Sequence, residues 1–176
     1  MTLARLRLLP AAFLLTLTAA ALAVAAVPGP AGAATGRFAG MHPARTADEK
    51  TAVRTVRAYN AALVDRDGDA VCRLHTKTGR RTAVLTAAMW YGTRRDATCA
   101  EATNAVCRKL ERYGSIATPM RQPRVKMLPR KKARVGFRTV GKVVRGTTVA
   151  PTRQWVELVK KDGAWRLTGA GGTRTL

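Results

Sequence analysis

Residues 155–167 read WVELVKKDGAWRL, and this stretch decides the fold class of the chain. Two apolar segments flank Asp162-Gly163, a dipeptide that favours the two-residue turn of a β-hairpin. The stretch therefore predicts two antiparallel strands. Farther back, apolar and basic residues alternate at 124–127 and 134–138, which is the period of a strand with one buried face. We therefore expect an antiparallel sheet over the C-terminal part of the chain.

The segment before this sheet has the period of helices. Thr46-Ala47-Asp48-Glu49 matches the S/T-x-x-E capping box and predicts a helix that ends near Asp65. The apolar face of this helix is formed by Val53, Val56, Tyr59 and Leu63. Asp69 is expected to cap a short second helix.

Two further helices are expected before the sheet. One spans about residues 80–90, and we expect Trp90 in the core together with the inward-facing Val84, Leu85 and Met89. The other opens with a second capping box at 98–101 and has an apolar stripe of Cys99, Ala102, Val106, Leu110 and Tyr113. Helices followed by strands predict an α+β fold with helices on one face of a curved antiparallel sheet.

A hydrophobic leader opens the chain. Arg5 and Arg7 precede about 20 apolar residues, and small residues follow around Ala33. This is the pattern of a secretory signal peptide, so we expect residues 1–33 to be cleaved off and residues 34–46 to form a flexible lead-in. The alternative is an uncleaved membrane anchor, because an apolar run of about 20 residues is long enough to span a bilayer. In both cases the protein is expected to be secreted or held at the cell surface.

The remaining 143 residues are enough for one domain, which we expect over 47–172. They carry thirty Lys and Arg residues against ten Asp and Glu residues, a net charge of +20. Outside the cell this charge favours retention near anionic cell-envelope polymer or lipid headgroups, and no specific nucleic acid is expected as a partner. Solubility alone and extracellular nucleic acid are the competing explanations.

Three cysteines lie in the exported part of the chain. An oxidising compartment predicts one disulfide. Cys99 and Cys107 share a predicted helix, where eight residues separate their Cα atoms by about 12 Å, whereas a disulfide needs less than about 7 Å. Cys72 is therefore one partner, with either Cys99 or Cys107. The remaining thiol is expected to be a buried apolar group rather than a nucleophile.

Several short segments resemble secreted nuclear-transport-factor-2-like proteins (SnoaL-like cone proteins) of high-GC Gram-positive bacteria. They are VRAYNAAL at 56–63, DGDA at 67–70, Cys72, TCA at 98–100 and the hairpin at 155–167. The resemblance implies a cone of helices and curved sheet around a pocket, and a disulfide between Cys72 and Cys99. The group contains isomerases, dehydratases and hydrolases as well as members without catalysis, so the resemblance assigns no activity.

An acid–base site in such a pocket would need a carboxylate beside a tyrosine or histidine. The nearest candidates are Tyr59, Asp65 and His75, but Tyr59 fits the core and Asp65 fits a solvent-exposed helix end. A pocket enzyme of isomerase or dehydratase type is therefore the alternative hypothesis. No metal or cofactor is expected. Ala70 and Thr76 stand where a calcium-binding EF-hand loop needs glycine and glutamate. The two histidines, His42 and His75, lack a ligand spacing suited to zinc, and no Gly-rich phosphate loop opens a helix.

A basic tract holds the remaining functional signal. No acidic residue occurs between Glu111 and Glu157, and residues 121–145 contain ten Lys and Arg residues. The candidate anion-binding residues are Arg130, Lys131, Lys132, Arg134 and Arg138. On alternating strands such residues share a solvent face that binds polyanions with an affinity that falls as salt rises. The leading hypothesis is a non-catalytic, envelope-associated protein that binds an anionic or small ligand or a protein partner; an extracellular nucleic-acid binder is a weaker one.

Overall fold

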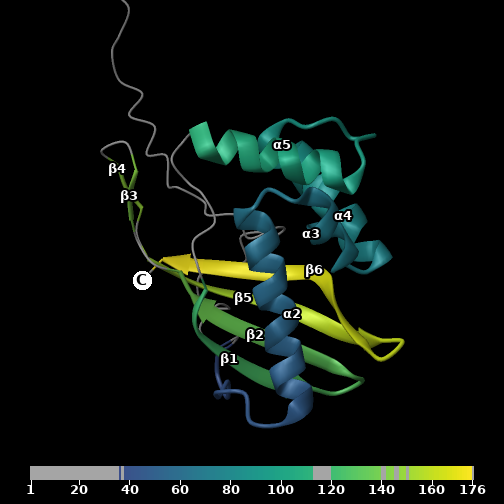
Figure 1. The fold of residues 1–176 in the computed structure, drawn as a ribbon, viewed down its shortest axis with the longest axis vertical. Helices are drawn as coiled ribbons and strands as arrows, with labels where there is room; N and C mark the ends of the chain where they lie inside the picture. Colours follow the sequence, from purple (N-terminus) through teal and green to yellow (C-terminus); the bar gives the residue numbers. More distant parts are fainter. Residues whose placement is uncertain are drawn as a thin grey trace, which may run out of the picture.

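The computed structural model describes residues 36, 38–112, 120–139, 142–144, 147–149 and 151–175. Within these residues, helices come first and strands follow, so the predicted α+β class is confirmed (Figure 1). The helices are α2 (Ala47–Val64), α3 (Gly68–Arg73), α4 (Lys77–Tyr91) and α5 (Cys99–Arg112). The strands are β1 (Arg121–Leu128), β2 (Lys132–Arg138), β3 (Lys142–Val144), β4 (Thr147–Val149), β5 (Thr152–Lys161) and β6 (Ala164–Thr175). The expected leader lies outside the described residues, and none of the described helices has the length and apolarity needed to cross a membrane.

The sheet has the strand order β1-β2-β5-β6 and is antiparallel throughout, while β3 and β4 form a separate hairpin. Helix α2 lies across one face of the sheet, and α3, α4 and α5 gather beyond the β6 edge (Figure 1). Alternate strand residues point toward α2 and are fully buried, among them Val125, Val135 and Leu158. They pack on the predicted apolar face of α2, where Val56 and Tyr59 are also buried. Burial of this shared apolar surface supplies the main stabilising free energy.

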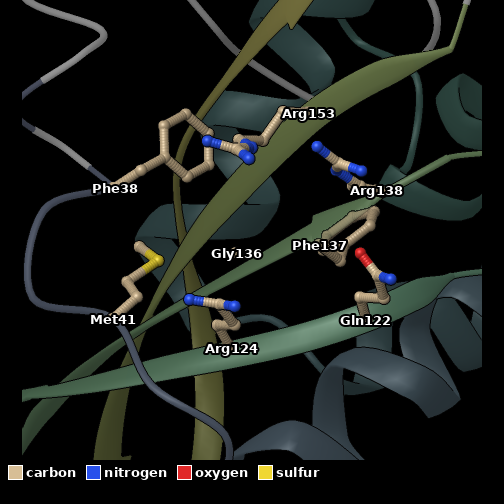
Figure 2. A pocket seen from close by; sticks show the side chains of 8 residues that line it. All are labelled: Phe38, Met41, Gln122, Arg124, Gly136, Phe137, Arg138 and Arg153. Atoms are coloured by element: carbon tan, nitrogen blue, oxygen red, sulfur yellow. The ribbon is translucent and has the colours of Figure 1, made fainter. Parts of the chain in front are cut away.

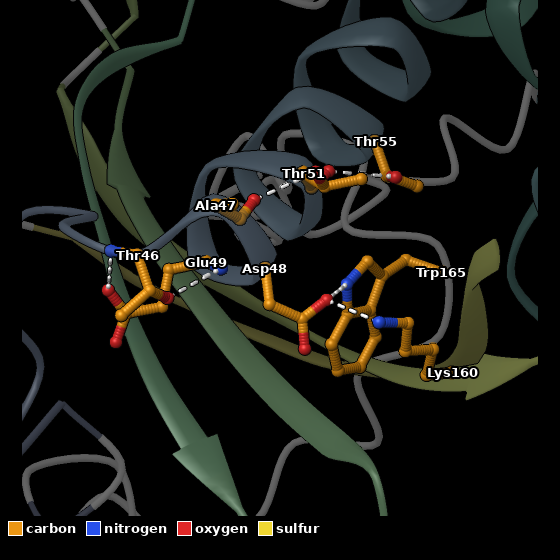
Figure 3. A network of polar contacts seen from close by, with 8 residues as sticks. All are labelled: Thr46, Ala47, Asp48, Glu49, Thr51, Thr55, Lys160 and Trp165. Carbon is orange, nitrogen blue, oxygen red and sulfur yellow. Dashed lines mark hydrogen bonds and ion pairs between the residues drawn. The ribbon is translucent and has the colours of Figure 1, made fainter. Parts of the chain in front are cut away.

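The capping box of α2 is confirmed. The Thr46 hydroxyl accepts a hydrogen bond from the backbone N–H of Glu49, and the Glu49 carboxylate accepts from the N–H of Thr46 (Figure 3). The same carboxylate also accepts from the N–H of Arg45. These backbone donors hold the pKa of Glu49 below its usual range. The hydrogen bonds of the capping box supply partners for N–H groups that a helix otherwise leaves unpaired at its first turn.

The first turn of α2 is also tied to the last hairpin. Asp48 lies 2.7 Å from the Lys160 ammonium and accepts a hydrogen bond of 3.1 Å from the Trp165 indole (Figure 3). The Lys160 contact lowers the pKa of Asp48. A carboxylate near a helix N-terminus also complements the helix dipole. The sequence stretch that predicts the hairpin thus also anchors the principal helix.

The hairpin turn and the disulfide have the geometry expected of them. Asp162 and Gly163 have φ values of 51° and 76°, both in the left-handed region that a type I′ turn requires. Cys72 and Cys99 form the disulfide, with Cα atoms 6.0 Å apart, and join α3 to α5. The thiol of Cys107 is free and buried, and burial raises its pKa.

Two local predictions about the helices are wrong. The N-cap of α3 is Asp67 rather than Asp69, because the Asp67 side chain accepts from the N–H of Ala70 at 2.8 Å. The exposed side chains of α4 include Leu85, Met89 and Trp90, which were expected to be buried.

The small residues of α4 explain this second error. Helix α4 is buried through Gly79, Ala83 and Ala87. A Cβ atom on Gly79 would lie 2.7 Å from the carbonyl oxygen of Leu167 in β6, so the helix backbone approaches the sheet closely there. The small-residue stripe faces the protein, and the larger apolar side chains of Leu85 and Met89 are left outside.

Candidate anion-binding site

The segment before α2 reaches the sheet face opposite the helices. His42 pairs with Val125 of β1 through backbone hydrogen bonds of 3.0 and 2.8 Å. Phe38 and Met41 lie against Gly136 of β2, and a Cβ atom there would come within 2.6 Å of the Met41 Sδ atom. Part of the expected lead-in therefore packs on the sheet, and a side chain at position 136 would force Met41 to shift.

Strand register places three arginines on this helix-distal face. Gly136 and Arg138 are two residues apart on β2, so they share a face. Arg138 lies directly opposite Arg153 of β5, and Arg124 of β1 lies opposite Gly136. Directly opposite side chains start about 5 Å apart and diagonal ones about 7–8 Å apart. Arg124, Arg138 and Arg153 therefore extend from neighbouring strands around one place.

A pocket of about 210 Å³ lies there. It is lined by Phe38, Met41, Gln122, Arg124, Gly136, Phe137, Arg138 and Arg153 (Figure 2). The Arg153 guanidinium lies over the Phe38 ring at 5.3 Å from its centroid, which fixes an arginine against the lead-in. Gln122 sits in a β-bulge with φ 45°, and such bulges redirect side chains beside sites.

The three pocket arginines form no ion pair with any described carboxylate. Their neighbours along the same strands differ in this respect. Glu157 lies 3.6 Å from the Lys132 ammonium and 3.4 Å from the Arg134 guanidinium. Arg134 also stacks on the Trp155 ring at 5.0 Å. Positive charge is therefore partly neutralised beside the pocket and left without a described counter-charge within it.

The five predicted anion-binding residues are divided by the structure. Arg138 lines the pocket. Arg130 and Lys131 are exposed in the β1–β2 turn with positive φ angles, at the other end of β2 from Arg138. Lys132 and Arg134 pair with Glu157. Binding by these residues stays a prediction.

Four residues of this pocket were not predicted from the sequence. Arg153 lies outside the basic tract, and Phe38 and Met41 lie in the segment expected to be flexible. Arg124 belongs to the tract but was not singled out. The pairing of Arg138 with Arg153 and of Arg124 with Gly136 brings the arginines together, and Phe38 and Met41 join them by packing on Gly136. Both register and packing are tertiary properties.

The acid–base candidates lie elsewhere. Tyr59 and His75 are buried and meet edge to face, with ring centroids 5.5 Å apart. The Nδ1–H of His75 donates to the carbonyl of Val71 at 2.9 Å, and burial lowers the pKa of His75. Asp65 is exposed at the C-cap of α2. Among the described residues the buried carboxylate is Glu49, which serves the capping box.

Comparison with known proteins supports the fold and nothing finer. No protein-family model matches the chain, and no curated protein matches it. A crystal structure of an NTF2-like protein with a cystatin-like fold from Novosphingobium aromaticivorans is similar, with a TM-score of 0.51 and 16% identity. The match covers 73% of this chain and 82% of that one. With the observed element order, it shows that this chain has a nuclear-transport-factor-2-like fold.

A second structure is also similar, but too weakly to support an argument. It is a putative calcium/calmodulin-dependent protein kinase II association domain from Xanthomonas campestris. The TM-score is 0.42 at 15% identity, over 76% of this chain and 89% of that one.

Proposed function

We propose that this protein is an exported, non-catalytic binding protein that holds a small oxyanion in the arginine pocket on the helix-distal face of its sheet. The observation that carries the proposal is the convergence of Arg124, Arg138 and Arg153 on one pocket without a described carboxylate partner. Like charges directly opposite each other destabilise a sheet. An anion bound between these side chains would relieve that cost.

The geometry favours a phosphate-type group over a carboxylate. A guanidinium presents a planar set of N–H donors that fits oxyanions in a bidentate manner. A carboxylate has two oxygens and one charge, whereas a phosphate group offers more acceptors and more charge to three guanidinium groups. The 210 Å³ volume is below the roughly 300–1,000 Å³ typical of drug-sized ligands. The pocket thus suits one anionic group of a larger molecule, with Phe38 and Met41 against its carbon part.

Export is supported by two independent features. The leader has the pattern of a signal peptide, and the Cys72–Cys99 disulfide is compatible with an extracellular protein. In that setting the phosphate groups of envelope polymers and lipid headgroups are available anions. The pocket-enzyme alternative is not proposed, because Tyr59 and His75 are buried in the core and do not line the arginine pocket, and Asp65 is exposed at the C-cap of α2.

Titration calorimetry with inorganic phosphate and with glycerol phosphate at low salt tests the proposal. The test variant is Arg124→Gln with Arg153→Gln. The control is Arg130→Gln with Lys131→Gln, which removes the same charge from the exposed turn. A charge-assisted hydrogen bond contributes about 1.5–3 kcal/mol. We therefore expect the test variant to lose affinity by roughly tenfold or more.

The control variant distinguishes phosphate binding at the pocket from general attraction of phosphate to a basic surface. It should retain the wild-type affinity within a small factor, because its two residues lie at the far end of β2. Equal losses in the two variants would show general charge attraction rather than a site. Absence of any phosphate or glycerol phosphate binding to the wild-type protein at low salt would also refute the proposal.

A further inference from the structure

Exposed apolar side chains gather on α4. The large hydrophobic side chains that are exposed in the described residues are Val64, Leu85, Met89, Trp90 and Met127. Three of these lie within six residues of one helix, and Met89 and Trp90 are the most exposed, at 65% and 61%. Singly exposed apolar residues are ordinary, but adjacent ones mark an interaction surface more often.

The packing of α4 explains why this apolar patch points outward. The helix rests on α5 and β6 through its small residues, and Leu85 and Met89 are four residues apart on another side of it. Arg81 precedes Leu85 by four residues and so shares that side. Trp90 follows in the last turn, directly before the left-handed cap at Gly92. It lies about 100° around the helix from Met89, on the side of Ala83 and Ala87, so its exposure comes from its place at the end of α4 rather than from the Leu85 side.

The surroundings of the patch are basic. No acidic residue occurs from Ala70 to Arg95, and this range contains Arg73, Lys77, Arg80, Arg81, Arg94 and Arg95. Arg94 pairs with Asp96 at 2.6 Å. Arg81 and Arg95 are exposed and form no ion pair with a described carboxylate.

We propose that α4 docks this protein on an anionic lipid surface. Leu85, Met89 and Trp90 would enter the headgroup region, and the flanking arginines would contact lipid phosphates. Interfacial helices combine these same features, an apolar side with Trp or Leu and a basic polar side. A phosphate-rich polymer offers charge but no apolar phase for Met89 and Trp90. A second copy of this chain would bring a basic surface against a basic surface.

The docking surface is separate from the arginine pocket. The pocket lies on β1, β2 and β5, whereas α4 packs on α5 and β6 beyond the opposite sheet edge (Figure 1). The proposal therefore does not rest on anion binding in the pocket, and the two can fail independently.

The fluorescence of Trp90 can report contact between α4 and lipid. The chain has three tryptophans, and Trp155 and Trp165 are buried at 6% and 2% exposure. Residues 34–176, which contain every described helix and strand, are mixed with vesicles of phosphatidylglycerol and phosphatidylcholine or of phosphatidylcholine alone. We expect a blue shift of the fluorescence and quenching by brominated lipid with the anionic vesicles. Unshifted, unquenched fluorescence with anionic vesicles at low salt would overturn the proposal.

Matched variants test the role of the helix. Leu85→Ser with Met89→Ser should weaken binding to anionic vesicles by roughly tenfold or more, because apolar burial contributes to interfacial binding. Val64→Ser with Met127→Ser removes the other two exposed apolar side chains and should leave binding within about twofold of wild type. All four substitutions are at exposed positions, and circular dichroism confirms folding.

Two other results would overturn the proposal. Equal weakening in both variants would show that α4 has no special role. Concentration-dependent dimerisation without lipid, lost in Leu85→Ser with Met89→Ser, would show that a second copy covers the patch. Sedimentation equilibrium of the wild-type protein and both variants measures this.

Discussion

Replacing Arg138 with glutamine should stabilise the unliganded protein. Arg138 faces Arg121 on one side and Arg153 on the other, so the substitution removes two directly opposed like-charge pairs. Each such pair destabilises a sheet by about 0.2–1 kcal/mol. The expected gain in the free energy of unfolding is therefore about 0.4–2 kcal/mol at low salt, or roughly 1–8 °C in Tm. Most substitutions destabilise a protein, so the sign itself is diagnostic.

Thermal unfolding followed by circular dichroism in a low-salt, phosphate-free buffer measures this effect. Lys161→Gln is the matched control, since Lys161 is an exposed strand residue opposite Ala164 and faces no like charge. The gain of Arg138→Gln should shrink in 0.5 M NaCl, because salt screens exposed charges beyond a few ångströms. Added phosphate should raise the Tm of the wild-type protein more than that of the variant, because a ligand stabilises only the state that binds it.

The reasoning is refuted if Arg138→Gln lowers Tm at low salt by as much as an ordinary surface substitution. A gain that is unchanged by salt would also refute it, because repulsion could not then be its cause.

Three further predictions concern the disulfide, the buried histidine and the seat of the lead-in. Cys72→Ala with Cys99→Ala removes a cross-link between residues 27 apart, which should cost about 3.5 kcal/mol in urea unfolding; a loss below about 1 kcal/mol would contradict the entropic account. Burial lowers the pKa of His75 below 6.5, so the unfolded chain takes up the proton first, and stability should fall as the pH drops below about 6.5. His75→Gln should flatten this fall between pH 7 and pH 5, and an unchanged pH profile would count against it. Gly136→Ala forces a Cβ atom against Met41 and should cost a net of about 1–2 kcal/mol in thermal unfolding, whereas wild-type stability would mean that the lead-in is not seated there.

Local sequence signals predicted most of the fold because they act through neighbouring residues. The capping box at Thr46 depends on hydrogen bonds within one helical turn, and the turn at Asp162-Gly163 depends on backbone conformations that these two residues tolerate. Both predictions are confirmed. The side of α4 that packs on the protein was predicted wrongly, because hydrophobicity favoured Leu85 and Met89 over the small residues that permit close backbone approach.

The sequence by itself determined the order of helices and strands, the excess of basic residues and the participation of Cys72 in a disulfide. These properties follow from composition and from interactions across a few residues. Only the tertiary structure decided which basic residues act together. Lys132 and Arg134 share the carboxylate of Glu157, whereas Arg124, Arg138 and Arg153 share a pocket. Strand register is the reason, because it pairs Arg138 with Arg153 and Arg124 with Gly136, residues that lie far apart in the sequence.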